Sequence, residues 1–219
     1  MQITSEIWQV GGEGFTAAAD AAVYLLRFAG RAAIVDAGCG GHGDRLAANI
    51  HALGVEPGQV DYLLLTHCHF DHTGGAADLA ARFDCPIVAH ELDAGALASG
   101  DDRLTAANWY GLPMPPLAVD RILTGDINTL TLGDRQITAI HIPGHTPGSL
   151  AYQVDSDGQR VLFGQDVHGP LHADFASDET AYRRSLARLA DIGADILCEG
   201  HFGVFHGADR VRDFIRSFL

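Results

Sequence analysis

The stretch Leu63-Leu64-Leu65-Thr66-His67-Cys68-His69-Phe70-Asp71-His72-Thr73-Gly74-Gly75 decides how the rest of the chain is interpreted. Its leucines complete the apolar run Val60–Leu65, which is typical of a strand that is covered on both faces. Three histidines and an aspartate follow at once, and paired glycines end the stretch. These polar side chains stand just beyond the carboxyl end of a strand, where layered α/β folds commonly build their sites.

Imidazole and carboxylate groups in this arrangement are typical ligands of zinc and other first-row metals. His67 and His69 are two residues apart, so in an extended loop both side chains leave on the same side. Three histidines from one hexapeptide do not comfortably share one tetrahedral ion, which favours two ions. Further side chains of the same kind follow other predicted strands, at His145 in a Pro- and Gly-rich turn, at Asp166 and at His201. Four such strand ends together predict a metal site.

Alternating strand and helix patterns predict an α/β fold and one compact domain over residues 1–219, built from two similar halves without a clear sequence repeat. Asp44 is expected to cap the first helix. Residues 99–120 break this pattern of strands and helices and contain Trp109 and Tyr110. Such a long irregular segment is expected to form either a lid over the substrate or a contact between subunits. The expected strands are Ala21–Phe28, Arg31–Asp36, Val60–Leu65, Pro86–Ala89, Gln136–Ile142, Ser149–Val154, Arg160–Phe163 and Asp195–Cys198. The expected helices are Asp44–Leu53, Gly74–Phe83, Glu91–Ala98, Glu179–Leu189 and Asp209–Phe218.

Composition narrows the classes of function. The 219 residues carry a formal net charge of −14, which argues against nucleic acid as a partner because such binding depends on basic phosphate contacts. All 14 basic residues are arginines, so Schiff-base and phosphate-loop lysines are excluded. The four scattered cysteines are expected to be buried thiols. Without a signal peptide or a membrane helix in the sequence, we expect a soluble, cytoplasmic protein that acts on a small molecule rather than at a membrane. The choice between a monomer and a homo-oligomer stays open.

The motif His67-Cys68-His69-Phe70-Asp71-His72 resembles the His-x-His-x-Asp-His signature of the metallo-β-lactamase superfamily, and the resemblance extends in motif order over nearly the whole chain. It implies an αβ/βα sandwich, in which two mixed β-sheets are flanked by helices. It also implies two divalent ions, with zinc as the first choice and iron or manganese as alternatives. The implied ligands are His67, His69 and His145 for one ion, Asp71, His72 and His201 for the other, and Asp166 as a bridge, while Asp36 supports the site from behind.

The chemistry implied by this resemblance is hydrolysis of an ester, thioester, lactone or amide by a metal-bridged hydroxide, with Asp71 orienting the nucleophile and passing a proton. Asp166 favours relatives of glyoxalase II and of the lactonases, because β-lactamases with a matching signature lack a bridging aspartate. The lactonases carry a tyrosine shortly after that aspartate, and Val167-His168-Gly169 stands there instead. A mononuclear iron dioxygenase acting on a thiol or persulfide, a β-lactamase-like amide hydrolase and a metal-binding protein without turnover remain alternatives.

The candidates for the substrate pocket are Trp109, Tyr110, His168 and His172. The two histidines follow Asp166 closely, so they fit either the pocket or a solvated loop. Cys68 is expected to point away from its neighbouring histidines and to pack in the core. The remaining histidines are expected to lie at the surface or to cap helices: His42, His51, His90, His141 and His206.

Overall fold

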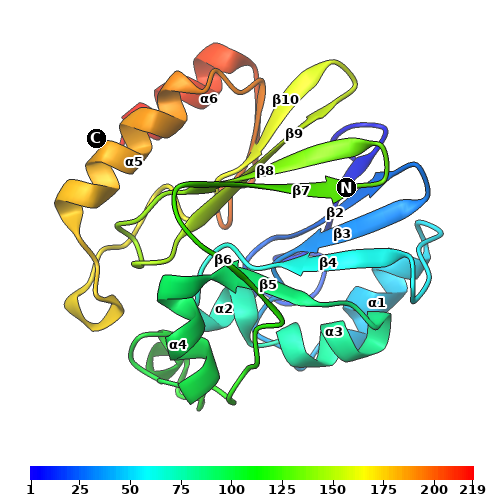
Figure 1. Ribbon diagram of the computed structural model, residues 1–219, viewed down its shortest axis with the longest axis horizontal. Coiled ribbons are helices and arrows are strands. Elements are labelled where there is room, and N and C mark those ends of the chain that lie inside the picture. Colours follow the sequence, from blue (N-terminus) through cyan, green and yellow to red (C-terminus); the bar gives the residue numbers. More distant parts are fainter.

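Two mixed six-stranded sheets pack face to face in the centre of the protein, whose computed structural model describes residues 1–219 (Figure 1). The first sheet has the order β1-β2-β3-β4-β5-β6 and the second β12-β11-β10-β9-β8-β7, so each half of the chain forms one sheet. The strands are β1 (Ile7–Gly11), β2 (Val23–Phe28), β3 (Arg31–Val35), β4 (Val60–Leu64), β5 (Ile87–His90), β6 (Arg121–Leu123), β7 (Ile127–Leu132), β8 (Arg135–His141), β9 (Leu150–Ser156), β10 (Gln159–Phe163), β11 (Ile196–Cys198) and β12 (Val204–His206).

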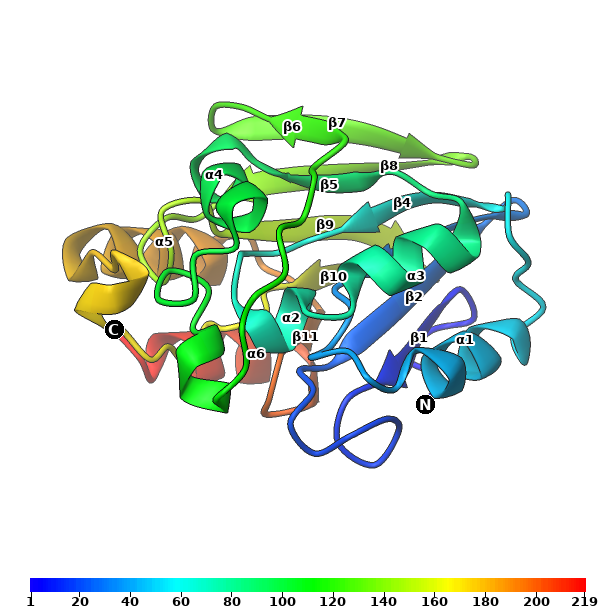
Figure 2. The same cartoon turned by 90° about the horizontal axis from the view of Figure 1, so that it is seen from below.

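Helices cover the outer face of each sheet, which confirms the αβ/βα sandwich. Figures 1 and 2 show α1 to α4 along the outer side of the first sheet, and α5 and α6 along the outer side of the second. None of them combines the length and the apolar character that a membrane span requires. The helices are α1 (Gly43–His51), α2 (Phe70–Thr73), α3 (Ala76–Phe83), α4 (Glu91–Ser99), α5 (Glu179–Asp191) and α6 (Ala208–Arg216), with 3-10 turns η1 (Ala107–Tyr110) and η2 (Ala173–Phe175).

Strand β2 shows why this architecture follows from the sequence. Tyr24 and Leu26 point into the core between the two sheets, whereas Val23 and Leu25 point into the core between the first sheet and its helices. Because both faces of the strand are covered, the residues read as a nearly continuous apolar run rather than an alternating one. The same double burial explains the leucines that precede the histidine motif in β4.

Most expected strands and helices are present, and the differences lie at the edges of the sheets. The sequence did not predict β1, β6, β7, β12 or the one-turn helix α2. Strands β6 and β12 contain three residues each, too few for a pattern, and β7 is an edge strand with one exposed face. The expected cap was wrong, because α1 begins at Gly43 and Asp44 lies in its first turn. There its carboxylate still faces the positive end of the helix.

The irregular segment 99–120 contains only the turn η1 and is tied to the histidine motif by its backbone. Phe70 N donates a hydrogen bond of 2.7 Å to Thr105 O, and Thr105 is fully buried. Cys68 Sγ lies 3.4 Å from Leu104 O. The segment is therefore held against the motif before any substrate arrives.

Two tyrosines cross the sandwich in opposite directions and hold the loops that follow the strands. The Tyr152 hydroxyl, from β9 of the second sheet, donates a hydrogen bond of 2.8 Å to Leu65 O beyond β4 of the first. The Tyr24 hydroxyl, from β2 of the first sheet, donates one of 2.7 Å to Glu199 O beyond β11 of the second. Both side chains are fully buried. The loops that contain His67 and His201 are thus each fixed by the opposite sheet.

We expect the substitution Tyr152→Phe to lower the free energy of unfolding by about 1–3 kcal/mol, because it leaves the buried Leu65 carbonyl without its donor. Urea denaturation with an unchanged m-value measures this difference. The control is Tyr62→Phe, since the half-buried Tyr62 hydroxyl only meets Arg121 at 3.5 Å. A Tyr152→Phe protein as stable as the wild type would contradict this role for the crossing hydroxyl.

Candidate metal centre

The predicted ligands come from four loops at one edge of the sandwich. The histidine motif follows β4, His145 follows β8, Asp166 follows β10 and His201 follows β11. Strands β3 and β4 are parallel, as are β10 and β11, so the loops after each pair leave the sheets at the same edge. Backbone hydrogen bonds join the loops across the two halves, such as Ala22 N to Gly200 O at 2.8 Å and Leu150 N to Thr66 O at 2.7 Å. Residues far apart in sequence therefore converge.

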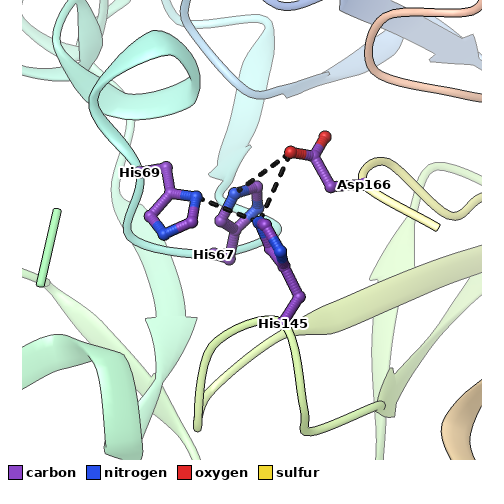
Figure 3. Close-up of side chains that lie close together, drawn as sticks. All are labelled: His67, His69, His145 and Asp166. Atoms are coloured by element: carbon purple, nitrogen blue, oxygen red, sulfur yellow. Dashed lines mark hydrogen bonds and ion pairs between the residues drawn. The ribbon is translucent and has the colours of Figure 1, made fainter. Parts of the chain in front are cut away.

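One group contains His67, His69, His145 and Asp166, whose side chains point toward a common centre (Figure 3). His145 Nε2 lies 3.0 Å from His69 Nδ1 and 3.4 Å from Asp166 Oδ2. His67 Nε2 lies 3.8 Å from the same carboxylate oxygen. All four residues are at most 9% exposed.

A second group contains Asp71, His72 and His201, and it reaches the other oxygen of Asp166. His201 Nε2 lies 3.2 Å from Asp71 Oδ2 and 3.4 Å from Asp166 Oδ1. His72 Nε2 lies 3.7 Å from Asp71 Oδ2 and 3.1 Å from Asp166 Oδ1. Asp166 thus directs one oxygen to each group, as a bridging carboxylate does.

Both groups have the spacing that divalent metal ions require. Ligand atoms bound at about 2.0–2.2 Å around a tetrahedral ion lie roughly 3.3–3.6 Å from one another, and the distances within the two groups scatter around that range. The Nε2 atoms of His67 and His72 and the Oδ1 atom of Asp166 are buried and have no hydrogen-bond partner. Buried polar atoms normally have hydrogen-bond partners, so unpaired ring nitrogens and a carboxylate oxygen within the two groups fit the binding of cations there.

Hydrogen bonds hold three of the histidines with the correct nitrogen toward the centre. His67 Nδ1 donates to Thr66 Oγ1 at 3.1 Å, because that hydroxyl already donates to Asp36. His145 Nδ1 donates to Pro170 O at 2.9 Å. His72 Nδ1 donates to Asp36 Oδ2 at 2.6 Å. In each neutral ring the remaining lone pair is then on Nε2, the atom that faces the other predicted ligands.

Asp36 lies behind the predicted ligand His72, on the side away from the other ligand atoms, as the sequence resemblance implies. It is fully buried, and its φ of +62° turns the chain sharply after β3. Its carboxylate accepts hydrogen bonds from the backbone N–H and the hydroxyl of Thr66, both at 2.8 Å, as well as from His72 and Gln165. Four donors stabilise the ionised carboxylate in a place without solvent.

The charges of the site also call for cations. Burial, together with the neighbouring histidines, holds the pKa of His67 and of His69 well below its usual range, so both rings are neutral. Burial opposes the ionised form of Asp166, but His72 and the other histidines hold its pKa well below the usual value. Burial likewise acts to lower the pKa of His201, yet Asp166 and Asp71 raise it to about 10. Carboxylates that attract protons onto neighbouring imidazoles would bind metal ions in their place.

A cavity of about 180 Å³ opens directly over the two groups. Trp109, Tyr110 and His168 line it, together with Phe175 from the segment after β10. His172 does not line it, but its ring contacts Trp109 with centroids 5.4 Å apart. Burial and the nearby Asp71 raise the pKa of Tyr110, so its hydroxyl stays protonated. A second, open hollow of about 460 Å³ lies on the other side of His201, between Glu13, Asp20 and Phe202.

Of the residues expected to lie elsewhere, Cys68 is buried in the core on the helix side of the first sheet. All four cysteines are free thiols, and three are buried. His90 precedes α4 and its side chain accepts from Leu92 N, while His42 and His206 are exposed. His141 and His51 bond backbone carbonyls.

Two buried carboxylates at the site were not anticipated from the sequence. Asp93, on α4, accepts from Cys68 N at 2.9 Å, from Thr146 Oγ1 at 2.7 Å and from Gly148 N at 2.7 Å. It therefore connects the histidine motif to the loop that contains His145. Glu199 accepts from His201 N and Phe202 N through Oε2 and lies 2.7 Å from His168 Nδ1 through Oε1. The only signal available was an acidic residue next to the Gly200-His201 pair.

We expect Asp36→Asn to weaken binding of zinc about 10- to 100-fold, because the amide places a donor opposite the N–H of His72 and the hydroxyl of Thr66. Asparagine tolerates the left-handed backbone at this position, so the chain can still turn. Competition with a chromophoric chelator measures the affinity. Asp155→Asn, on an exposed position of β9, is the control. Equal affinities for the two variants would show that Asp36 does not hold the site.

The sequence was compared with families and proteins of known type. The family model of the metallo-β-lactamase superfamily matches residues 19–201. The chain is 30% identical to the acyl-coenzyme A thioesterase MBLAC2 of Gallus gallus, over 90% of this chain and 77% of that protein. It is 35% identical to the hydroxyacylglutathione hydrolase of Acidiphilium cryptum, over 61% of this chain and 44% of that protein.

The fold agrees with solved structures of the same type. A metallo-β-lactamase of Cronobacter sakazakii superposes with a TM-score of 0.81 at 26% identity, covering 99% of this chain and 91% of that one. The match of the family model over most of the chain, including the complete histidine motif, confirms the resemblance and the class of metal-dependent hydrolase expected from it. The chain belongs to the metallo-β-lactamase superfamily.

Proposed function

We propose that the chain is a dinuclear metal-dependent hydrolase that cleaves thioesters, and related esters or lactones, of small apolar acyl groups. The observation that carries the proposal is the position of Asp166. Its two oxygens serve two separate groups of ligand atoms, 3.4 and 3.8 Å from the first and 3.1 and 3.4 Å from the second. A site for a single ion would have no use for the second group.

His67, His69 and His145 would hold one ion, Asp71, His72 and His201 the other, and Asp166 both, with zinc as the expected metal. When bound, such ions lower the pKa of a bound water to about 7 and polarise the carbonyl oxygen of the substrate. Asp71 uses one oxygen toward His201, which leaves its second oxygen to orient the attacking water and to accept its proton. Asp36 and Thr66 keep the rings of His72 and His67 from turning away.

The cavity favours a small apolar acyl group. Trp109 and Phe175 pack with ring centroids 4.8 Å apart and form an apolar wall, and the protonated Tyr110 hydroxyl adds a donor near Asp71. Its volume of about 180 Å³ is below the roughly 300–1,000 Å³ of sites for drug-sized ligands. The thioester class is the first choice because the names of the two relatives above both describe hydrolysis of thioesters. The leaving group would lie toward the open hollow beyond His201.

We expect the zinc-loaded protein to hydrolyse acyl thioesters of N-acetylcysteamine, an uncharged leaving group, with two ions per chain by elemental analysis. Asp71→Asn should lower kcat by about 100-fold or more, because the amide neither accepts a proton nor binds a cation as carboxylate does. Asp155→Asn is the matched control. Two ions without turnover of thioesters, esters, lactones or β-lactams would contradict the proposal, and so would one iron with oxygen consumption on a thiol substrate.

The acyl pocket is tested separately by Trp109→Ala. Burial of an aromatic acyl group against the ring of Trp109 contributes about 1.5–3 kcal/mol of binding free energy. Without the ring, kcat/KM for a phenylacetyl thioester should therefore fall about 10- to 150-fold. The value for an acetyl thioester should change little. The control is Leu112→Ala, because Leu112 lies in the same segment and is about as exposed as Trp109 (52% and 54%) but does not line the cavity. A uniform loss for both acyl groups would place the acyl group elsewhere.

A further inference from the structure

A second buried carboxylate and histidine pair lies beside the metal centre, formed by Glu199 and His168. Glu199 is fully buried, although a buried charge is costly unless it is fully hydrogen bonded. One of its oxygens, Oε2, accepts from the backbone N–H groups of His201 at 2.7 Å and Phe202 at 2.8 Å. The other, Oε1, lies 2.7 Å from Nδ1 of His168. The carboxylate therefore fixes both the turn that contains His201 and the ring of His168.

The pair repeats the geometry of His72 and Asp36. In both pairs a carboxylate with no exposed surface bonds Nδ1 of the histidine, at 2.6 Å for His72 and 2.7 Å for His168. In both, a ring that donates from Nδ1 leaves Nε2 as the atom that can bind a metal ion. A carboxylate behind the ring is the usual partner of a metal-binding histidine, because it fixes the tautomer and raises the basicity of the ligand.

His168 also lies close enough to the second group of ligand atoms. A nitrogen of His168, a nitrogen of His201 and an oxygen of Asp166 all lie within 4.8 Å of one another. The rings of His168 and His201 meet edge to face with centroids 5.2 Å apart. Two atoms on opposite sides of one ion with bonds of about 2.1 Å lie roughly 4.2 Å apart, so side-chain shifts of about 0.6 Å at most bring the three atoms into one coordination shell.

The loop that contains His168 is held on both sides. The Tyr182 hydroxyl donates to Val167 O at 2.6 Å, and His145 Nδ1 donates to Pro170 O at 2.9 Å. Gly169 N closes a turn onto Asp166 O at 3.2 Å. The ring is only 17% exposed, with Phe202 against it at a centroid distance of 4.9 Å. His168 is therefore a fixed ring rather than a solvated loop residue.

We propose that His168 is a further protein ligand of the second cation, held in the binding tautomer by Glu199. This extends the second group from Asp71, His72, His201 and the shared Asp166 to five side chains, so that the two ions have unequal ligand sets. The inference rests on the two-ion site of the proposed function, but it concerns metal binding and not the substrate.

The test uses the variant His168→Gln, whose amide can still donate to Glu199 and so leaves no unpaired buried charge. Zinc is added to the metal-free protein and both affinities are measured by chelator competition, with no substrate present. We expect the second equivalent to bind about 10- to 100-fold more weakly than in the wild type, and the first to be unchanged. The visible spectrum of the protein with two equivalents of cobalt should also change, since an imidazole nitrogen is lost.

His206→Gln, at an exposed position of β12, is the control and should match the wild type in both measurements. Thermal unfolding of the metal-free proteins excludes a loss of fold as the cause. Two wild-type-like affinities together with an unchanged cobalt spectrum in His168→Gln would overturn the inference while leaving the two-ion site intact. A wild type that binds one ion only would overturn both.

Discussion

Positive charge is the constraint on which this protein depends. Seven side chains from four loops direct ring nitrogens and carboxylate oxygens at one another, mostly at 3.0–3.8 Å. Six of them are buried, and His201 lies at the solvent edge with 33% of its side chain exposed. Lone pairs at such distances repel, and burial removes the water that would screen them. The carboxylates of Asp71 and Asp166 raise the pKa of His72 and of His201 even against burial, so they favour positive charge at these rings. The packing of the loops therefore favours positive charge between them.

The sandwich keeps these loops together by linking each sheet to the other. Tyr152 and Tyr24 cross the core in opposite directions and bond the carbonyls that follow β4 and β11. Asp93 then connects the histidine motif with the loop of His145, and Asp36 connects β3 with the ring of His72. The ligands are therefore positioned by contacts that no single half of the chain could supply. A site between two layers needs this bracing, because the binding energy of the ions alone would not set the relative position of the sheets.

The convergence of the proposed ligands could be predicted from the sequence because each stands in a short motif next to an apolar strand or a Gly- and Pro-rich turn. The supporting carboxylates behave differently. Asp93 lies on α4 beside exposed positions such as Leu92, and Glu199 is a lone acid in a loop, so both look solvated until their donors are known. Their partners are 25 to 55 residues distant for Asp93 and 31 for Glu199 and His168. The short edge strands β6 and β12 were not predicted for a similar reason. Three residues show no periodicity, so these strands are defined only by their pairing with a neighbouring strand.

The proposed ligands and the cavity above them come from different parts of the chain. The motifs contain the proposed ligands, whereas the apolar wall of the cavity comes from two segments outside the motifs, 99–120 and 167–178. These segments meet above the ligands, where Trp109 contacts Phe175 and Arg103 pairs with Asp174. The ion pair is exposed and adds little free energy, so the aromatic contact and the bond from Phe70 N to Thr105 O must define the wall. That bond joins the wall directly to the histidine motif, so the backbone of the wall and the ligand atoms beneath it keep a fixed relative position, and only the aromatic side chains are free to adjust the shape of the cavity.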